Sequence, residues 1–188
     1  MNILNVLYDS AKTPIIKIDN LKDHCKINKF KSLGICDTSN LSGALEFSET
    51  ISKQGTQPII GTQIIFNYKN ERGHLTLIPK NESGYKKVIK LSSMSYLEND
   101  NTSEPHCNIN ELFRENSDFI LMSGTINGLI GKLFVKGYHS EIEEIYKKLS
   151  NNFKNNFYIE IQRHNDLNEK SFEKFNLNLS YKLDIHII

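Results

Sequence analysis

The sequence lacks the features that mark secreted and membrane proteins. Its 188 residues include only three cysteines, an odd number without metal-type spacing. This argues against a disulfide framework and suits a reducing compartment. No apolar run approaches the ~20 residues that cross a bilayer, and no basic segment followed by an apolar one indicates a signal peptide. We therefore expect a cytoplasmic protein with no membrane partner.

The sequence also lacks an excess of either charge and the common catalytic motifs. The formal net charge is +1, and lysines alternate with acidic residues, as on an ordinary solvated helix. A chain that grips nucleic acid usually carries a basic stripe, so we expect no direct nucleic-acid binding. The sequence contains no Gly-x-Gly-x-x-Gly, no Gly-Lys-Ser/Thr loop and no Gly-x-Ser-x-Gly elbow. Dinucleotide, P-loop and hydrolase-elbow chemistry are thereby disfavoured.

Strand-like and helix-like segments take turns along the chain. This alternation predicts parallel βαβ units and an α/β barrel or open sheet. We expect Asn81 and Ser140 to cap helices, residues 67–73 to form a turn, and residues 98–107 to form a loop. The expected strands cover residues 3–7, 33–36, 57–66, 74–79, 119–122, 157–162 and 183–188; the expected helices cover residues 18–27, 41–54, 85–94, 109–114, 141–153 and 169–181, with a further apolar segment over 129–135.

The stretch from Leu33 to Phe47 is the first place to look for chemistry. A short apolar strand ends on a carboxylate, Asp37, and a polar turn leads into a helix. Active sites in α/β proteins lie where strands end and loops begin, so Asp37 is a candidate ligand or catalytic residue. The same residues also fit a structural interpretation, in which Asp37, Ser39 or Asn40 caps the following helix.

Four separated stretches carry a recognisable pattern. They are Cys36-Asp-Thr-Ser-Asn-Leu-Ser-Gly-Ala-Leu-Glu-Phe47, Gln57-Pro-Ile-Ile-Gly-Thr-Gln63, His74-Leu-Thr-Leu-Ile-Pro-Lys-Asn-Glu-Ser-Gly-Tyr85 and Phe157-Tyr-Ile-Glu-Ile-Gln-Arg-His164. In this order they resemble the N-terminal PHP (polymerase and histidinol phosphatase) domain of bacterial DNA polymerase III alpha subunits. The resemblance implies a PHP-type distorted (β/α)7 barrel over residues 1–188, incomplete at the C-terminus because family members continue into the rest of the barrel and the polymerase palm.

The resemblance also implies a degenerate metal site. Metal-binding members hold a cluster of ions with His, Asp and Glu at strand ends, beginning with a His-x-His in the first strand, but residues 2–8 here contain no histidine. Of the family positions that can be placed, Asp37 and His164 remain. Thr38, Gln63 and Thr125 stand where ligands are lost. Because a catalytic zinc normally needs three protein ligands, we expect no metal, no catalytic residue and no cofactor, and we interpret His164 as a structural histidine.

The resulting functional hypothesis is a non-catalytic part of an enzyme. The parent family is a DNA-directed DNA polymerase, a nucleotidyltransferase of DNA replication, whose Mg²⁺-binding carboxylates belong to the palm. The implied partners are the remainder of the alpha subunit and the proofreading exonuclease subunit, in the bacterial cytoplasm. Two alternatives are an active metal-dependent PHP phosphoesterase or 3′→5′ exonuclease, and a freestanding non-enzymatic remnant. Whether this segment is itself an enzyme stays open.

Overall fold

The computed structural model describes residues 17–99, 103–114 and 118–188, and the chain divides into two compact units after Gln63. Each unit is described by itself. The strand expected at residues 3–7 lies outside the described residues.

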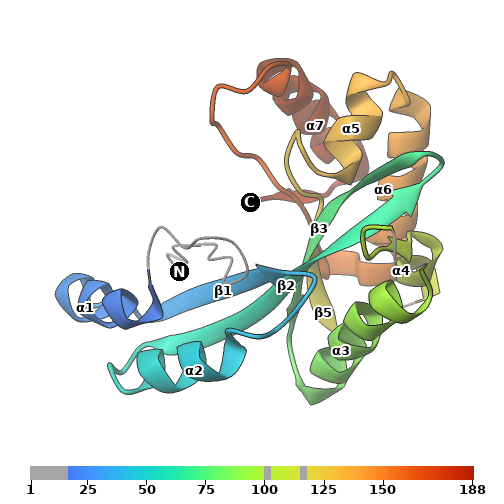
Figure 1. The fold of residues 1–188 in the computed structure, drawn as a ribbon. Coiled ribbons are helices and arrows are strands. Elements are labelled where there is room, and N and C mark those ends of the chain that lie inside the picture. The colour runs from blue at the N-terminus through green and yellow to red at the C-terminus, as the bar shows by residue number, and fades with distance from the viewer. Residues whose placement is uncertain (1–16, 100–102, 115–117) are drawn as a thin grey trace. The chain divides into compact units, whose positions relative to one another are not determined.

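In residues 17–63, the described part of the first unit, the chain forms two helices, one strand and the beginning of a second strand (Figure 1). The helices are α1 (Ile18–Asn28) and α2 (Ala44–Ser52), and β1 (Ser32–Thr38) pairs in parallel with the first half of β2 (Gln57–Tyr68). Apolar residues recur at helical spacing on α1 and α2 and form one core with β1. That core consists of Ile18, Leu21, Cys25, Leu33, Ile35, Phe47 and Ile51.

The sheet of the second unit mixes parallel and antiparallel pairs. β2 is followed after two residues by β3 (Glu71–Pro79), and β3 pairs antiparallel with β5 (Phe119–Met122). Next come β6 (Phe157–Ile159) and β7 (His186–Ile187), both added in parallel. The short β4 (Cys107–Asn108) pairs with β2. The strand order is therefore β2-β3-β5-β6-β7, with β4 off this path.

The helices of the second unit cover this sheet. α3 (Glu82–Leu97) and α5 (Leu129–Val135) pack on β3, and α4 (Asn110–Arg114) packs on α6 (His139–Phe153). A single 3-10 turn (Lys154–Asn156) joins α6 to β6, and α7 (Glu169–Leu183) precedes β7. Asn81 begins α3 as expected, because its side-chain oxygen accepts the Gly84 N–H at 2.8 Å.

The predicted α/β class is confirmed, and three local predictions need correction. The turn expected over residues 67–73 is present but shorter, because β2 runs to Tyr68 and β3 begins at Glu71, which leaves residues 69–70 as the turn. The strands are not uniformly parallel, since a two-residue connection between β2 and β3 can only form a hairpin. Ser140 does not cap α6, which begins one residue before it; its hydroxyl instead donates to Glu141.

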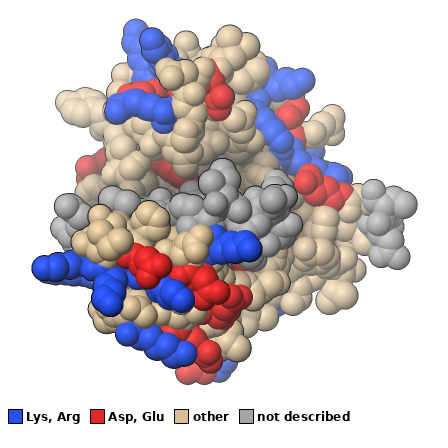
Figure 2. Space-filling view, turned by 60° about the vertical axis from the view of Figure 1, so that its left-hand side comes forward, with Lys and Arg blue, Asp and Glu red and all other residues tan. Residues whose placement is uncertain are grey.

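Charges of both signs are interspersed on the surface. On the face shown in Figure 2, Lys and Arg side chains lie beside Asp and Glu side chains. Among the ion pairs that the structure contains, Lys86–Glu82 and Lys147–Glu143 join residues four apart on one helix. Among the described residues, no helix is long and apolar enough to cross a membrane.

Candidate functional site

Asp37, the first candidate, is buried at the end of β1 and binds the start of the next helix. Only 2% of the residue is exposed, and its Oδ2 accepts the backbone N–H of Gly43 at 2.9 Å. Gly43 immediately precedes α2, so the carboxylate satisfies a donor at the helix N-terminus, where negative charge is favourable. The contact predicted by the structural interpretation of Asp37 is present.

The turn after Asp37 is held by a second set of hydrogen bonds. The Thr62 hydroxyl lies 2.7 Å from the Asp37 carbonyl oxygen and 3.0 Å from that of Asn40, and its residue is fully buried. The Asn40 side chain donates to the Thr38 carbonyl oxygen and accepts the Ser42 N–H. Such local side-chain bonds are typical of Asn in turns. Hydrogen bonds between protein groups therefore hold this turn.

Thr38 and Gln63, two positions where family ligands are lost, lie opposite each other. They are register partners at the end of the β1–β2 pairing. The chain then turns at Ser39, whose N–H donates to the Gln63 carbonyl oxygen at 2.7 Å. A hydroxyl and a neutral amide thus occupy this strand end. Neither supplies the anionic charge or imidazole nitrogen that transition-metal sites prefer.

Thr125 belongs to the second unit, in the loop between β5 and α5. The loop reverses at Gly124, where φ is +77°, and Gly131 lets α5 pack directly against it. A Cβ on Gly131 would lie 2.1 Å from the Ile126 carbonyl oxygen, so only glycine fits. The Thr125 hydroxyl accepts the Asn127 N–H at 3.2 Å. Thr125 therefore has a local structural role in this loop.

His164, the second surviving family position, lies after β6 and is exposed. Its Nε2 is 2.9 Å from Oε1 of Gln162. Its backbone N–H, like that of Asn165, donates to the buried carboxylate of Glu169, the first residue of α7. This hydrogen-bonded histidine agrees with the structural interpretation of His164. The prediction that His164 binds no metal rests on the ligand count and stays a prediction.

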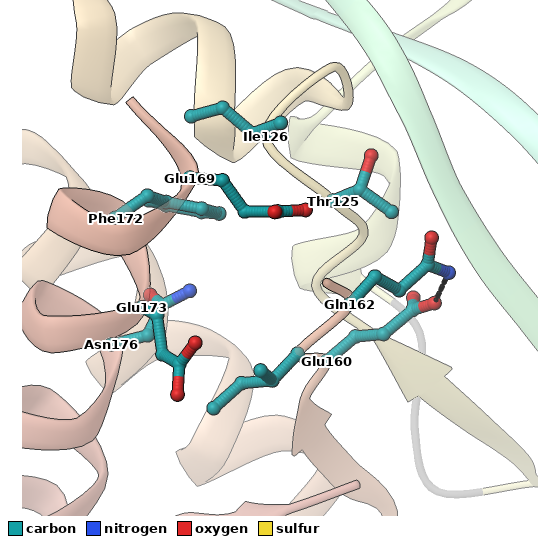
Figure 3. A pocket seen from close by; sticks show the side chains of 9 residues that line it. Thr125, Ile126, Glu160, Gln162, Glu169, Phe172, Glu173 and Asn176 are labelled. Carbon is teal, nitrogen blue, oxygen red and sulfur yellow. Dashed lines mark hydrogen bonds between the residues drawn. The ribbon is translucent and has the colours of Figure 1, made fainter. Parts of the chain in front are cut away.

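A pocket opens beside this segment, between the β5–α5 loop, the residues after β6 and α7 (Figure 3). It holds about 220 Å³ of space, part of it open to solvent. Thr125 is the one family position among its lining residues. Those residues are Thr125, Ile126, Glu160, Ile161, Gln162, Glu169, Phe172, Glu173 and Asn176.

Glu160 is one of two buried acids that line this pocket, the other being Glu169. Burial raises the pKa of Glu160 above its usual range, while hydrogen bonds from the Gln162 side chain and the Gly124 backbone act in the opposite direction. The Gln162 amide donates to Oε1, the contact drawn as a dashed line in Figure 3. The backbone N–H of Glu160 donates to the buried Ser123 hydroxyl at 3.0 Å. Glu160 is therefore held by Ser123 and Gly124 after β5 and by Gln162 two residues further along the chain.

These donor sets do not fit a metal cluster. In the first unit the family's ligand positions hold a carboxylate, a hydroxyl and an amide, on Asp37, Thr38 and Gln63. In the second unit Glu169 already accepts backbone N–H groups, and Glu173 already pairs with Arg163. Within the described parts of the chain, no group of three or more His, Cys, Asp or Glu side chains is placed to hold a metal ion. The described residues therefore provide no set of three such side chains for the family's metal chemistry.

The sequence reasoning missed the acids and the amide of the pocket. Glu160 sits in the Phe157–His164 block but was not singled out, and Glu169 and Asn176 looked like ordinary positions of an amphipathic helix. The available signal was polar residues at Glu169, Glu173 and Asn176, spaced four and three apart on one helix face. Such spacing is common on solvated helices, so it could not have distinguished a pocket wall.

Comparison with known proteins places this chain within a family. The sequence profile of the PHP domain matches residues 10–164. A solved chain from Bifidobacterium adolescentis, described as a metal-dependent phosphoesterase, aligns over 91% of this chain and 80% of its own, at 11% identity and a TM-score of 0.37. That likeness is too loose to support an argument about site or activity.

Curated proteins similar to this chain include DNA polymerase III alpha subunits from several bacteria. The Rickettsia bellii protein is 32% identical over 86% of this chain, and the Caulobacter vibrioides protein is 31% identical over 92%. The Buchnera aphidicola protein is 34% identical over 84%. The chain spans only 14%, 16% and 14% of these three relatives. The similarity is thus to one segment of much larger proteins.

Proposed function

This chain belongs to the PHP domain family, and we propose that it forms the PHP segment of a replicative DNA polymerase III alpha subunit. Within that subunit it acts as a non-catalytic scaffold, which packs against the polymerase body and provides a docking surface. The proposal rests on the sequence similarity to alpha subunits over 84–92% of this chain, and on the chemistry of the strand ends.

The non-catalytic role rests mainly on the hydrogen bond that Asp37 accepts from the start of α2. In the family this position supplies a metal ligand; here the buried carboxylate binds the N–H of Gly43 and anchors α2. Its neighbours at the strand end, Thr38 and Gln63, are neutral. A hydrolytic metal site needs several charged or imidazole ligands and a general base. One carboxylate committed to a helix start supplies neither.

The proposal assigns the other functions of an alpha subunit to other parts of it. Nucleotidyl transfer with Mg²⁺ belongs to the polymerase palm, and DNA contacts belong to the polymerase body rather than to this segment, whose charge is balanced. The partners are the remainder of the alpha subunit and, by family inference, the proofreading exonuclease subunit. The site of action is the bacterial cytoplasm, where replication takes place.

The first experiment measures bound metal and hydrolysis together. The purified chain is analysed for zinc, manganese and iron, then assayed with a phosphate monoester and a single-stranded DNA 3′ end in added Mn²⁺. We expect less than stoichiometric metal and no turnover above the Asp37→Asn variant, which removes the charge but retains a side-chain oxygen. Stoichiometric metal that this variant loses, together with turnover, would establish the phosphoesterase or exonuclease alternative.

The second experiment tests docking. The chain is mixed with the proofreading exonuclease subunit of the same organism and examined by analytical ultracentrifugation. Binding of the exonuclease subunit, by a chain that shows no hydrolysis in the first experiment, supports the scaffold role. If the chain binds neither the exonuclease subunit nor the remainder of the alpha subunit, supplied as a separate chain, the result would instead indicate a freestanding remnant.

A further inference from the structure

A row of side-chain hydrogen bonds runs along the segment that follows β6. The Gln162 amide nitrogen donates to Oε1 of Glu160 at 2.5 Å, and Oε1 of Gln162 lies 2.9 Å from Nε2 of His164. The Ile161 N–H donates to the Ile188 carbonyl oxygen, so strand-like pairing continues past the end of β6. Alternate residues of an extended segment point to the same side. The three side chains, called the relay below, thus connect a buried carboxyl with an exposed imidazole.

The segment itself is held by contacts outside the relay. The backbone N–H of His164 donates to the carboxylate of Glu169 on α7. Arg163, between Gln162 and His164 in the sequence, forms a two-point ion pair with Glu173 of α7, with N–O distances of 2.6 and 3.1 Å. The backbone and Arg163 therefore fasten this segment to α7, and the relay is free to serve another purpose.

The Glu160 carboxylate determines which way the Gln162 amide faces. An ionised carboxylate only accepts hydrogen bonds, so it requires the amide nitrogen on its side. Figure 3 shows this nitrogen turned toward Glu160 and the amide oxygen turned away from it. The reversed amide would bring two acceptor oxygens together and lose the hydrogen bond. The backbone of Gly124 also donates to Glu160, which helps to hold the carboxylate in place.

The Gln162 amide in turn determines which ring nitrogen of His164 carries the proton. The amide oxygen can only accept, so Nε2 of His164 must be the donor in their 2.9 Å contact. A neutral imidazole has one N–H and one unprotonated nitrogen, so the unprotonated nitrogen is Nδ1. Nδ1 makes no hydrogen bond to any residue that the structure describes, and His164 is exposed. Its lone pair is therefore open to solvent.

We propose that Gln162 is a positioning residue, which passes the orientation set by Glu160 to His164 and makes Nδ1 the basic ring nitrogen that His164 presents at the surface. As an acceptor, Nδ1 suits a single N–H or O–H donor. A metal site would need further ligands, and no group of three His, Cys, Asp or Glu side chains is placed to hold an ion in the described ranges. The scaffold function does not require this relay, so the inference goes beyond it.

Two other histidines provide internal references. His24 on α1 is exposed, and its ring makes no hydrogen bond to the described part of the chain, so its two tautomers should follow the preference of a free ring. In His106, Nδ1 lies 2.8 Å from the Glu104 carbonyl oxygen. That oxygen only accepts, so the neutral His106 ring carries its proton on Nδ1. The protein thus contains references for a free ring and for the opposite tautomer.

The test is NMR spectroscopy of the ring nitrogens in the full chain, at a pH at which the same signals show neutral rings. The variants His164→Gln, His24→Gln and His106→Gln identify the signals. We expect the ratio of the Nε2–H to the Nδ1–H form to be about two- to tenfold higher in His164 than in His24, the range that one hydrogen bond supplies. His106 should show mainly the Nδ1–H form. A ratio in His164 equal to or below that of His24 would overturn the proposal.

Three variants separate the relay from its surroundings. Gln162→Met removes the amide while keeping the length of the side chain, and it should bring the His164 ratio to that of His24. Glu160→Met should change the ratio in the same direction and shift the side-chain amide signals of Gln162. Glu173→Gln, the matched control, alters an acid outside the relay and should leave the ratio unchanged. If Glu160→Met fails to fold, Gln162→Met at its half-buried position still decides. An unchanged ratio in Gln162→Met would contradict the positioning role.

Discussion

Replacing Asp37 separates the two roles that this carboxylate could have. As an anchor of α2 it holds the Gly43 N–H, so Asp37→Ala leaves a buried donor without its acceptor. Asp37→Asn keeps an oxygen at the same place. As a metal ligand, in contrast, the charge itself is needed, and the two substitutions should be almost equally harmful to metal binding.

The structure sets the size of the effect. Loss of an acceptor for a buried N–H costs about 1–3 kcal/mol, and for a chain of this length each kcal/mol lowers the unfolding midpoint by about 2–4 °C. We expect Asp37→Ala to unfold roughly 2–12 °C below the wild type, and Asp37→Asn to lose less than about half as much. The assay is thermal unfolding followed by circular dichroism, with EDTA and with added Zn²⁺ or Mn²⁺.

Metal dependence is the result that would refute this reasoning. A metal bound at 100 times its dissociation constant would stabilise the folded chain by about 2.7 kcal/mol. The wild type would then unfold several degrees higher with metal than with EDTA, and both variants would lose that difference. We expect the wild-type midpoint to be the same in EDTA and in metal. A metal-dependent shift that disappears in Asp37→Asn would make the carboxylate a ligand.

Three further predictions concern stability. Glu160→Gln should stabilise the chain at pH 8. Burial raises the folded-state pKa of Glu160, so the wild type loses stability as the pH rises from about 4.5 through that pKa. The gain from the substitution should vanish below about pH 4.5, which denaturant titrations at several pH values would show. Gly131→Ala should cost more than about 3 kcal/mol of unfolding free energy or prevent folding, because the added Cβ would lie 2.1 Å from the Ile126 carbonyl oxygen. In Gly55→Ala the added Cβ would meet no atom within 4 Å, so the substitution should cost only about 1–2 kcal/mol for the positive φ. Asn81→Ala should lose about 1 kcal/mol of unfolding free energy with its helix cap, while Ser140→Ala should be within about 0.5 kcal/mol of the wild type, and equal losses would contradict the cap assignment.

Local signals predicted most helices and strands correctly. Apolar spacing predicted helices over residues 18–27 and 169–181, close to the observed α1 (Ile18–Asn28) and α7 (Glu169–Leu183), and Asn81 correctly predicted the start of α3. These elements are set by interactions within a few residues, which sequence periodicity records.

Long-range pairing was the part that sequence could not supply. The turn between β2 and β3 was expected over residues 67–73, because polar residues there obscure two strands that continue through them. The antiparallel pairing of β3 with β5 depends on partners 40 or more residues apart, as in Leu77 with Leu121. Tertiary pairing overrides local polarity in such strands. The same holds for Asn176, because its hydrogen bond to Tyr146 joins residues 30 positions apart and its place in the pocket wall depends on tertiary packing.

Asp37 and His164, the two surviving family positions, lie in segments that protein groups hold. The bond of Asp37 to Gly43 and the contacts of Thr62 hold the turn between β1 and α2. His164 likewise lies in a segment that Glu169 holds through backbone N–H groups. A metal that bound only the folded chain would add to the stability of these segments by mass action. The unfolding midpoint with and without metal and the measured metal content should therefore give the same answer.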